Sequence, residues 1–308
     1  MEAPFSQVAA TALINLSLAW VVGLLAARFW LTSRTVSWQQ IAANKLSRTM
    51  PVALVACAIS MVFSMWSESA VMADVAWLNA GPAFYQMLLT THYGHAGLAA
   101  IALLAGALVA HWRLNPHGSN KRYVVIIAVL IVMVAIARVS IGHAFEYGLF
   151  SLAVAVEVLH ILLMALWVGA VFVAGWMVLP VVLAHESCAS TERARYLHTL
   201  SDWATVALVG IVITGTYNAY RVLGSPRDLV EGFYGYVLLF KISCVLIAIA
   251  LGGFNKFYGL RAALSQQNAI SQRGLRIVVS ILRIESVALL LAIIAAAVLT
   301  SSMPPGSQ

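Results

Sequence analysis

Eight apolar stretches, each long enough to cross a lipid bilayer as a helix, follow one another along this chain. They cover approximately residues 8–31, 49–72, 85–112, 123–145, 151–184, 203–223, 234–258 and 277–300. A bilayer-crossing helix needs roughly 20 apolar residues. Hydrophobic residues make up 62% of the chain and charged residues 9%, whereas a soluble domain carries about 25% charged residues. The sequence therefore predicts an all-α, polytopic membrane protein with eight transmembrane helices.

The connections between these stretches are too short to fold as soluble domains. We therefore expect residues 1–308 to form a single integral-membrane helical domain. The first residues, MEAPFSQ, lack the basic segment of a cleavable signal peptide. We expect the first span to remain in the mature protein.

Lysine and arginine concentrate on one side of the predicted bundle. The connections after the first, third, fifth and seventh spans hold 13 of the 18 basic residues, and basic connections normally face the cytoplasm. Both termini are accordingly predicted to lie outside. The net charge of +7 then reflects topology and contact with the lipid bilayer. The chain lacks the basic stripe with interleaved aromatic residues that is typical of proteins that bind nucleic acid.

Two pairs of spans resemble each other. INLSLAWVVG at residues 14–23 has the spacing of HILLMALWVG at 160–169, and Tyr93-Gly94 aligns with Tyr234-Gly235. The paired spans run in the same direction, so the similarity indicates a possible 4+4 parallel repeat. Apolar segments also resemble one another by chance, and chance similarity is the alternative.

Glu157 and Arg138 are ionisable residues inside predicted spans, where such groups are costly and have a function or a partner. They lie at similar distances from the loop that joins the fourth and fifth spans, so we expect them to pair. A catalytic or proton-carrying role for Glu157 is the alternative.

Four of the eight histidines gather toward the outer half of the predicted bundle. His92 and His95 open the third span, His143 lies near the outer end of the fourth, and His160 lies within the fifth. A single histidine in a span is most often a hydrogen-bonded residue between helices. Four on one side favour a metal site at the outer face.

Sulfur-bearing side chains support a metal role. Cys57, Met61, Met65 and Met72 fall along one line of the second span, together with Glu68. Met164 lies one turn from His160. Imidazole with thioether or thiolate favours copper, in particular Cu(I). Ordinary packing of a methionine stripe is the alternative.

The sequence contains no GxxxxGK[ST], HExxH or GxSxG motif. An ATP-driven pump is therefore not expected, and we predict that the protein is not an enzyme. Its three cysteines form no CxxC pair and predict neither a disulfide framework nor a zinc site.

Ordered motifs in the second half resemble the CopD/PcoD family of bacterial copper resistance proteins, most strongly over residues 138–305. They are GHA at 142–144, LHILLMALWVGA at 159–170, TGTYNAYRVLG at 214–224, YGYVLLFK at 234–241, LGGFNKFYGLR at 251–261 and RIESVALLLAIIAAAVLTSSMPP at 283–305. The resemblance implies an eight-helix protein of the bacterial inner membrane, with periplasmic termini, that handles copper beside a periplasmic carrier of the CopC type.

The resemblance also implies a metal role for His143 and His160, which fall on the family's motif histidines. Related sequences often carry a further histidine in the first helix, where this chain has Ile14 followed by Asn15. We expect His92 and His95 to compensate for it.

Three functions remain open from the sequence. The first is a transporter that accepts copper at the periplasmic face and moves it across the membrane. The second is an oxidoreductase whose transmembrane histidines bind a b-type haem. The third is a copper scaffold or sensor that does not transport.

Overall fold

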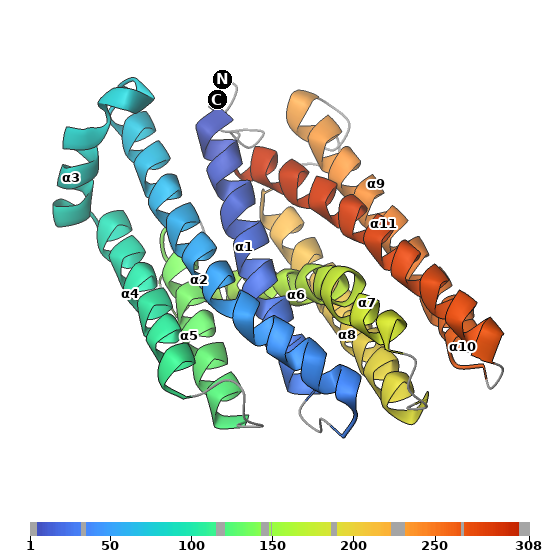
Figure 1. The fold of residues 1–308 in the computed structure, drawn as a ribbon. Helices are drawn as coiled ribbons and strands as arrows, with labels where there is room; N and C mark the ends of the chain where they lie inside the picture. Colours follow the sequence, from blue (N-terminus) through green and yellow to red (C-terminus); the bar gives the residue numbers. More distant parts are fainter. Residues whose placement is uncertain are drawn as a thin grey trace.

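The computed structural model describes residues 5–31, 35–114, 121–142, 148, 150–185, 190–222, 232–265 and 268–301. Every regular element in these ranges is helical, and eight helical segments are long and apolar enough to cross a membrane (Figure 1). The prediction of an all-helical, multi-pass membrane protein is confirmed.

Eight segments form the bundle, and a short corner lies between the second and third of them. The bundle consists of α1 (Phe5–Trp30), α2 (Ser37–Met72), α4 (His92–Arg113), α5 (Lys121–Val139), α6 (Leu152–Val173) with η3 (Ala174–Val178) and α7 (Leu179–Ala184), α8 (Ser190–Val222), α9 (Gly232–Phe254) with η5 (Asn255–Gly259) and α10 (Leu260–Ala263), and α11 (Asn268–Ser301). The corner consists of η1 (Trp77–Asn79) and α3 (Gly81–Thr90). Helix α1 begins and α11 ends at the same end of the bundle (Figure 1).

The third span is shorter than the predicted 85–112, because the helix breaks at Thr91. This residue has an extended backbone (φ −110°, ψ 149°), and its side chain accepts a hydrogen bond from the Gly94 amide of α4. Such a side chain caps a helix N-terminus. The apolar residues before it form the separate helix α3, because an apolar pattern does not reveal where a cap interrupts it.

Three other spans begin earlier than predicted. Helices α2, α8 and α11 start at Ser37, Ser190 and Asn268, whereas their apolar stretches start near 49, 203 and 277. Hydropathy detects only the part of a helix that suits hydrocarbon, and backbone hydrogen bonds continue through polar turns beyond it.

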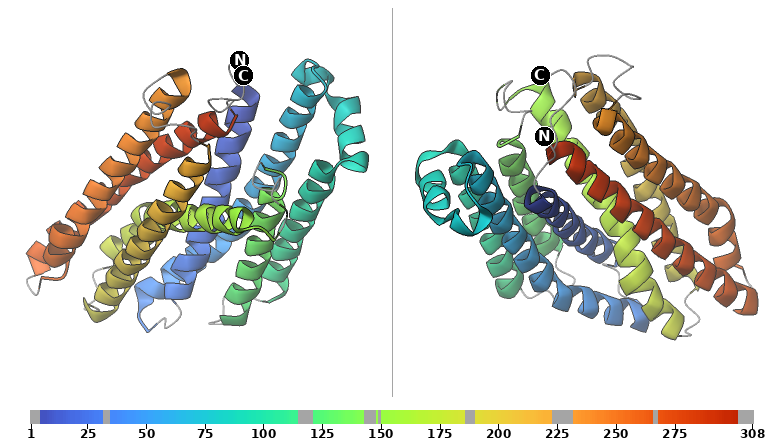
Figure 2. Two further views of the ribbon diagram at one scale, coloured as in Figure 1. Left: turned by 180° about the vertical axis from the view of Figure 1, so that it is seen from behind. Right: turned by 90° about the horizontal axis from the view of Figure 1, so that it is seen from above.

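Helix α1 lies at the centre of the bundle, packed against α2, α6 and α11 (Figure 2). Its closest approach is to α6, at Gly23 and Gly169. A Cβ atom on Gly169 would collide with the backbone of Ala19 and Gly23. The two glycines therefore set the distance between α1 and α6, as small residues do at helix contacts in membranes.

Two spanning segments contain a π-helical turn. The first, η3, comes just before Pro180, which is the second residue of α7. Proline lacks the N–H that would bond to the preceding turn and its ring crowds that turn, so a local widening there is expected. The second, η5, contains no proline.

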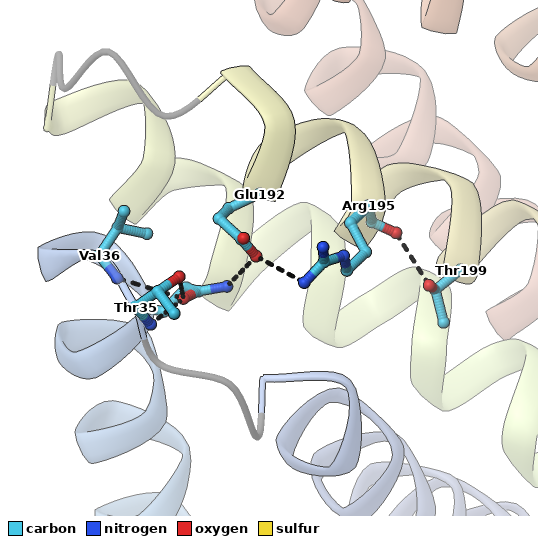
Figure 3. A network of polar contacts seen from close by, with 6 residues as sticks. Thr35, Val36, Glu192, Arg195 and Thr199 are labelled. Atoms are coloured by element: carbon cyan, nitrogen blue, oxygen red, sulfur yellow. Dashed lines mark hydrogen bonds and ion pairs between the residues drawn. The ribbon is translucent and has the colours of Figure 1, made fainter.

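A polar network holds the start of α2 against the start of α8, at the end of the bundle away from the start of α1 (Figures 1 and 3). Gln39 donates a hydrogen bond to Glu192 (3.3 Å), and Arg195 forms an ion pair with the same carboxylate (3.4 Å). The backbone amide of Thr35 donates to Gln39 (2.9 Å). This network joins the two halves of the chain.

Candidate metal site

His160 lies on α6 and faces α8, where its imidazole is partly buried. Its Nδ1 atom is 2.8 Å from the hydroxyl oxygen of Thr214. Gly215 follows on α8, and a Cβ atom there would lie 3.3 Å from the Cε1 atom of the ring. The imidazole therefore packs closely against the backbone of Gly215, where a side chain would crowd it.

The contacts of Thr214 determine which ring nitrogen of His160 carries the proton. The threonine hydroxyl donates to the backbone oxygen of Gly210 (2.6 Å). Its oxygen is then an acceptor toward the ring, so the proton of a neutral imidazole sits on Nδ1. Among the described residues, none bonds to Nε2. The Nε2 lone pair is therefore available for a metal ion, and Thr214 orients the ring as an outer partner of a metal ligand does.

Two other predicted histidines, His92 and His95, lie in the first turn of α4. His92 is the first residue of α4, and its Nε2 is 3.1 Å from the backbone oxygen of Ser140, at the end of α5. His143, three residues further along the chain, lies outside the described residues. The exposed His95 contacts the backbone oxygen of Leu89 at 3.2 Å.

The sulfur-bearing residues occupy different environments. Cys57, Met61 and Met65 are buried in the bundle core, and Met65 fills the space above Gly97 of α4. This burial fits the packing interpretation of the stripe. Met72, at the end of α2, is exposed, and Met164 packs partly buried one turn from His160. Within the described part of the chain, no three His, Cys, Asp or Glu side chains come together to hold a metal ion.

The direct ion pair expected between Arg138 and Glu157 does not form. Arg138 donates to the side-chain oxygen of Asn15 on α1 (2.7 Å), and Glu157 accepts from the amide of Asn218 on α8 (2.7 Å). The positive charges of Arg138 and of Lys241 on α9 still act on the Glu157 carboxylate. The prediction of direct pairing is thus wrong in its contacts, because each charged group finds a nearer amide.

Polar contacts form successive rungs between the antiparallel helices α6 and α8. Glu157 contacts Asn218, and His160 contacts Thr214 one turn deeper. Sequence reasoning assigned no partner role to Asn15, Thr214 or Asn218. Thr214 and Asn218 stand four residues apart in the TGTYNAY segment, on one face of a helix, and this spacing was the available signal for them.

Glu157→Gln is expected to destabilise the protein by about 1–3 kcal/mol, because it removes the negative charge that acts on Arg138 and Lys241 in a poorly solvated site. Lys241→Met added to this variant is expected to restore part of the loss. Thermal unfolding in detergent measures both, with a thiol-reactive dye that reports exposure of the buried Cys57 and Cys244. Equal unfolding temperatures for wild type and Glu157→Gln would refute the electrostatic coupling.

The fold and the site define a multi-pass helical membrane protein with a histidine and charged groups at membrane depth. Residues 1–152, which include α1 to α5, match the family described as copper resistance protein D-like, N-terminal domain, and residues 194–299 match copper resistance protein D. The chain belongs to the copper resistance protein D family. No curated protein and no solved structure matches it.

Proposed function

We propose that this protein accepts copper at the periplasmic face of the bacterial inner membrane and moves it across. One observation carries the proposal. Thr214 contacts the Nδ1 atom of His160, and no described residue bonds to its Nε2 atom, which can therefore bind a metal ion. Family membership supports copper as the cargo. The protein is proposed to be a carrier without enzymatic activity.

The residues on the same face of α6 as His160 support a path for copper into the membrane. Met164 and Trp167 follow at spacings of four and three residues, which keeps the three side chains on one face of a helix. The imidazole and the thioether then offer successive ligands for Cu(I). Trp167 lies deeper, where it lines a cavity.

The outer histidines are proposed to collect copper before it reaches His160. The contact of His92 with Ser140 holds α4 beside the end of α5, close in sequence to His143. His95 lies on the same outer turn of α4. A periplasmic carrier of the CopC type is the proposed donor, with both termini of this chain on its side of the membrane.

We further propose that the single domain arose as a 4+4 parallel repeat. The two family matches fall in opposite halves of the chain. Gly23 and Gly169, which align in the sequence comparison, meet each other where α1 crosses α6. Equivalent residues contact each other at a two-fold axis, so this meeting supports a pseudo-two-fold relation between the halves.

Uptake of isotopic copper into proteoliposomes tests the proposal. Purified protein is expected to carry copper into the vesicles well above the rate of protein-free vesicles. Copper binding without uptake would favour the scaffold or sensor. An absorption spectrum of the same sample tests for haem, since a Soret band would favour the oxidoreductase.

Thr214→Val is expected to weaken copper binding by about 10–100-fold, because valine keeps the shape of the side chain but cannot accept the Nδ1–H bond of His160. Thr214→Ser keeps the hydroxyl and is expected to bind within a few-fold of wild type. Competition with a coloured Cu(I) chelator gives both affinities. If the valine and serine variants bind equally well, Thr214 does not position the ligand.

A further inference from the structure

A cavity of about 290 Å³ lies between α8 and the α9–η5 segment, with residues of α6 and α11 completing its wall. Most of its lining is aliphatic. The polar side chains that reach it are Ser201, Thr205, Asn255, Lys256 and Glu285. In the proposed repeat, the corresponding helices of the first half are α2 and α4, which pack directly against each other through Met65 and Gly97. The cavity is thus a feature of the second half.

Glu285 brings a carboxyl group to this cavity from the middle of α11. Its side chain is 2% exposed, and its Oε1 atom accepts a hydrogen bond from the indole of Trp167 (3.2 Å). A carboxylate inside a membrane protein is costly unless a cation or several donors compensate its charge. One neutral indole donor does not do so, and the carboxyl is more stable there with a proton bound.

The cations near Glu285 are directed elsewhere. Lys256, in η5, lines the cavity, and its ammonium donates to the hydroxyl of Thr205 on α8 (3.0 Å). Arg283, one half-turn before Glu285 on α11, donates to the backbone oxygen of Gly175 and stacks on Trp176. The residues that face Glu285 from α6 and α9 are Trp167 and Gly252. Neither residue carries a titratable group.

Asn255 supplies an independent sign that the cavity is hydrated. Its Oδ1 atom is buried and accepts no hydrogen bond from any described residue. Buried acceptors are almost always satisfied, by water where protein offers no donor. Asn255 begins the π-helical turn η5, and such turns are frequent at functional sites. The cavity has room for several waters at about 30 Å³ each.

The two carboxyl groups at membrane depth have opposite surroundings. The positive charges of Arg138 and Lys241 act on Glu157, which also accepts a hydrogen bond from Asn218, and together they offset part of the cost of burying its carboxylate. Glu285 has a neutral donor and a cavity beside it. Nearby positive charges thus favour the ionised form of Glu157, and among the described residues Glu285 has no such support.

We propose that the cavity between α8 and the α9–η5 segment is a proton-binding site, in which Glu285 takes up and releases a proton. Release transfers the proton from the carboxyl to a water in the cavity, which leaves a carboxylate and a hydronium ion; uptake reverses this step. The site goes beyond the proposed copper function and does not depend on it.

A hydrophobic carbodiimide tests the proposal without copper. A protonated carboxyl group adds across one N=C bond of the reagent and forms an O-acylisourea. Its acyl group then shifts from oxygen to nitrogen, and mass spectrometry maps the resulting stable N-acylurea to a residue. We expect Glu285 to be labelled more strongly than Glu157 in the same sample, because Arg138 and Lys241 favour the ionised form of Glu157. Labelling of Glu285 is expected to fall as the pH rises, by about tenfold for each pH unit above the point at which half of its carboxyl groups have lost their proton. It should disappear in Glu285→Gln.

Trp167→Phe is a second variant, which keeps an aromatic ring and removes the donor to Oε1. Loss of this donor disfavours the carboxylate, so labelling of Glu285 should persist to higher pH than in wild type.

The proposal fails if Glu285 is not labelled, or if its labelling is independent of pH. Protection of Glu285 by sodium ions at constant pH would overturn it in favour of a metal-cation site. If copper uptake fails while Glu285 is labelled as expected, the proposed transport function is refuted and the proton-binding site is not.

Discussion

Replacing His160 by alanine is expected to reduce copper uptake into proteoliposomes to the level of protein-free vesicles. The imidazole of His160 is the proposed copper ligand, because Thr214 contacts its Nδ1 and no described residue bonds to its Nε2. Alanine removes the ligand and leaves the hydroxyl of Thr214 bonded to Gly210, so no strong donor is left unsatisfied. The loss should therefore concern copper and leave the fold intact.

His198→Ala is the matched control for this variant. His198 is exposed on the polar first part of α8, far in sequence from the rungs that join α6 and α8. Its removal is expected to leave uptake unchanged. Wild-type uptake by His160→Ala, with both variants folded, would exclude His160 from the path of copper.

Gly169→Val is expected to prevent correct folding, with a destabilisation of about 3 kcal/mol or more. Even a Cβ atom at this position would collide with the backbone of Ala19 and Gly23, and backbone cannot move aside as a side chain can. Helices α1 and α6 would have to separate at the centre of the bundle. Size-exclusion chromatography of the detergent-solubilised variant should show aggregated protein in place of a single symmetric peak.

The same substitution at Gly106 controls for the loss of a glycine in a spanning helix. Gly106 lies on an exposed face of α4, and a Cβ atom there meets nothing within 4 Å. Gly106→Val is expected to behave as wild type in chromatography. A normal peak for Gly169→Val would mean that α1 and α6 do not cross as closely as described.

Hydropathy was sufficient to predict the eight spans, because the bilayer imposes a length and an apolar composition on every spanning helix. It could not predict the break at Thr91, where one hydroxyl caps α4 within an apolar stretch. Nor could it predict the π-turn η5, in which a Cβ atom on Gly259 would meet Asn255 of the same turn and Val278 of α11. These features are set by contacts between helices and not by composition.

The candidate site was predictable in part. Its ionisable members, His160, Glu157 and Arg138, stand out in apolar spans. Their partners do not, since Asn15 and Thr214 are residues of ordinary polarity that gain importance only when folding places them beside a charge or a ring. The pairing of Arg138 with Glu157 was wrong for the same reason, because similar depth on adjacent helices does not specify which polar atom is nearest.

X-ray absorption at the copper edge of Cu(I)-loaded, purified protein is the most direct test of the central claim that His160 binds copper. The wild-type spectrum is expected to show imidazole scattering around copper. His160→Ala should lose one imidazole contribution, and His198→Ala should retain the full wild-type signal. Identical imidazole scattering in wild type and His160→Ala would contradict the claim and place the copper ligands elsewhere in the chain.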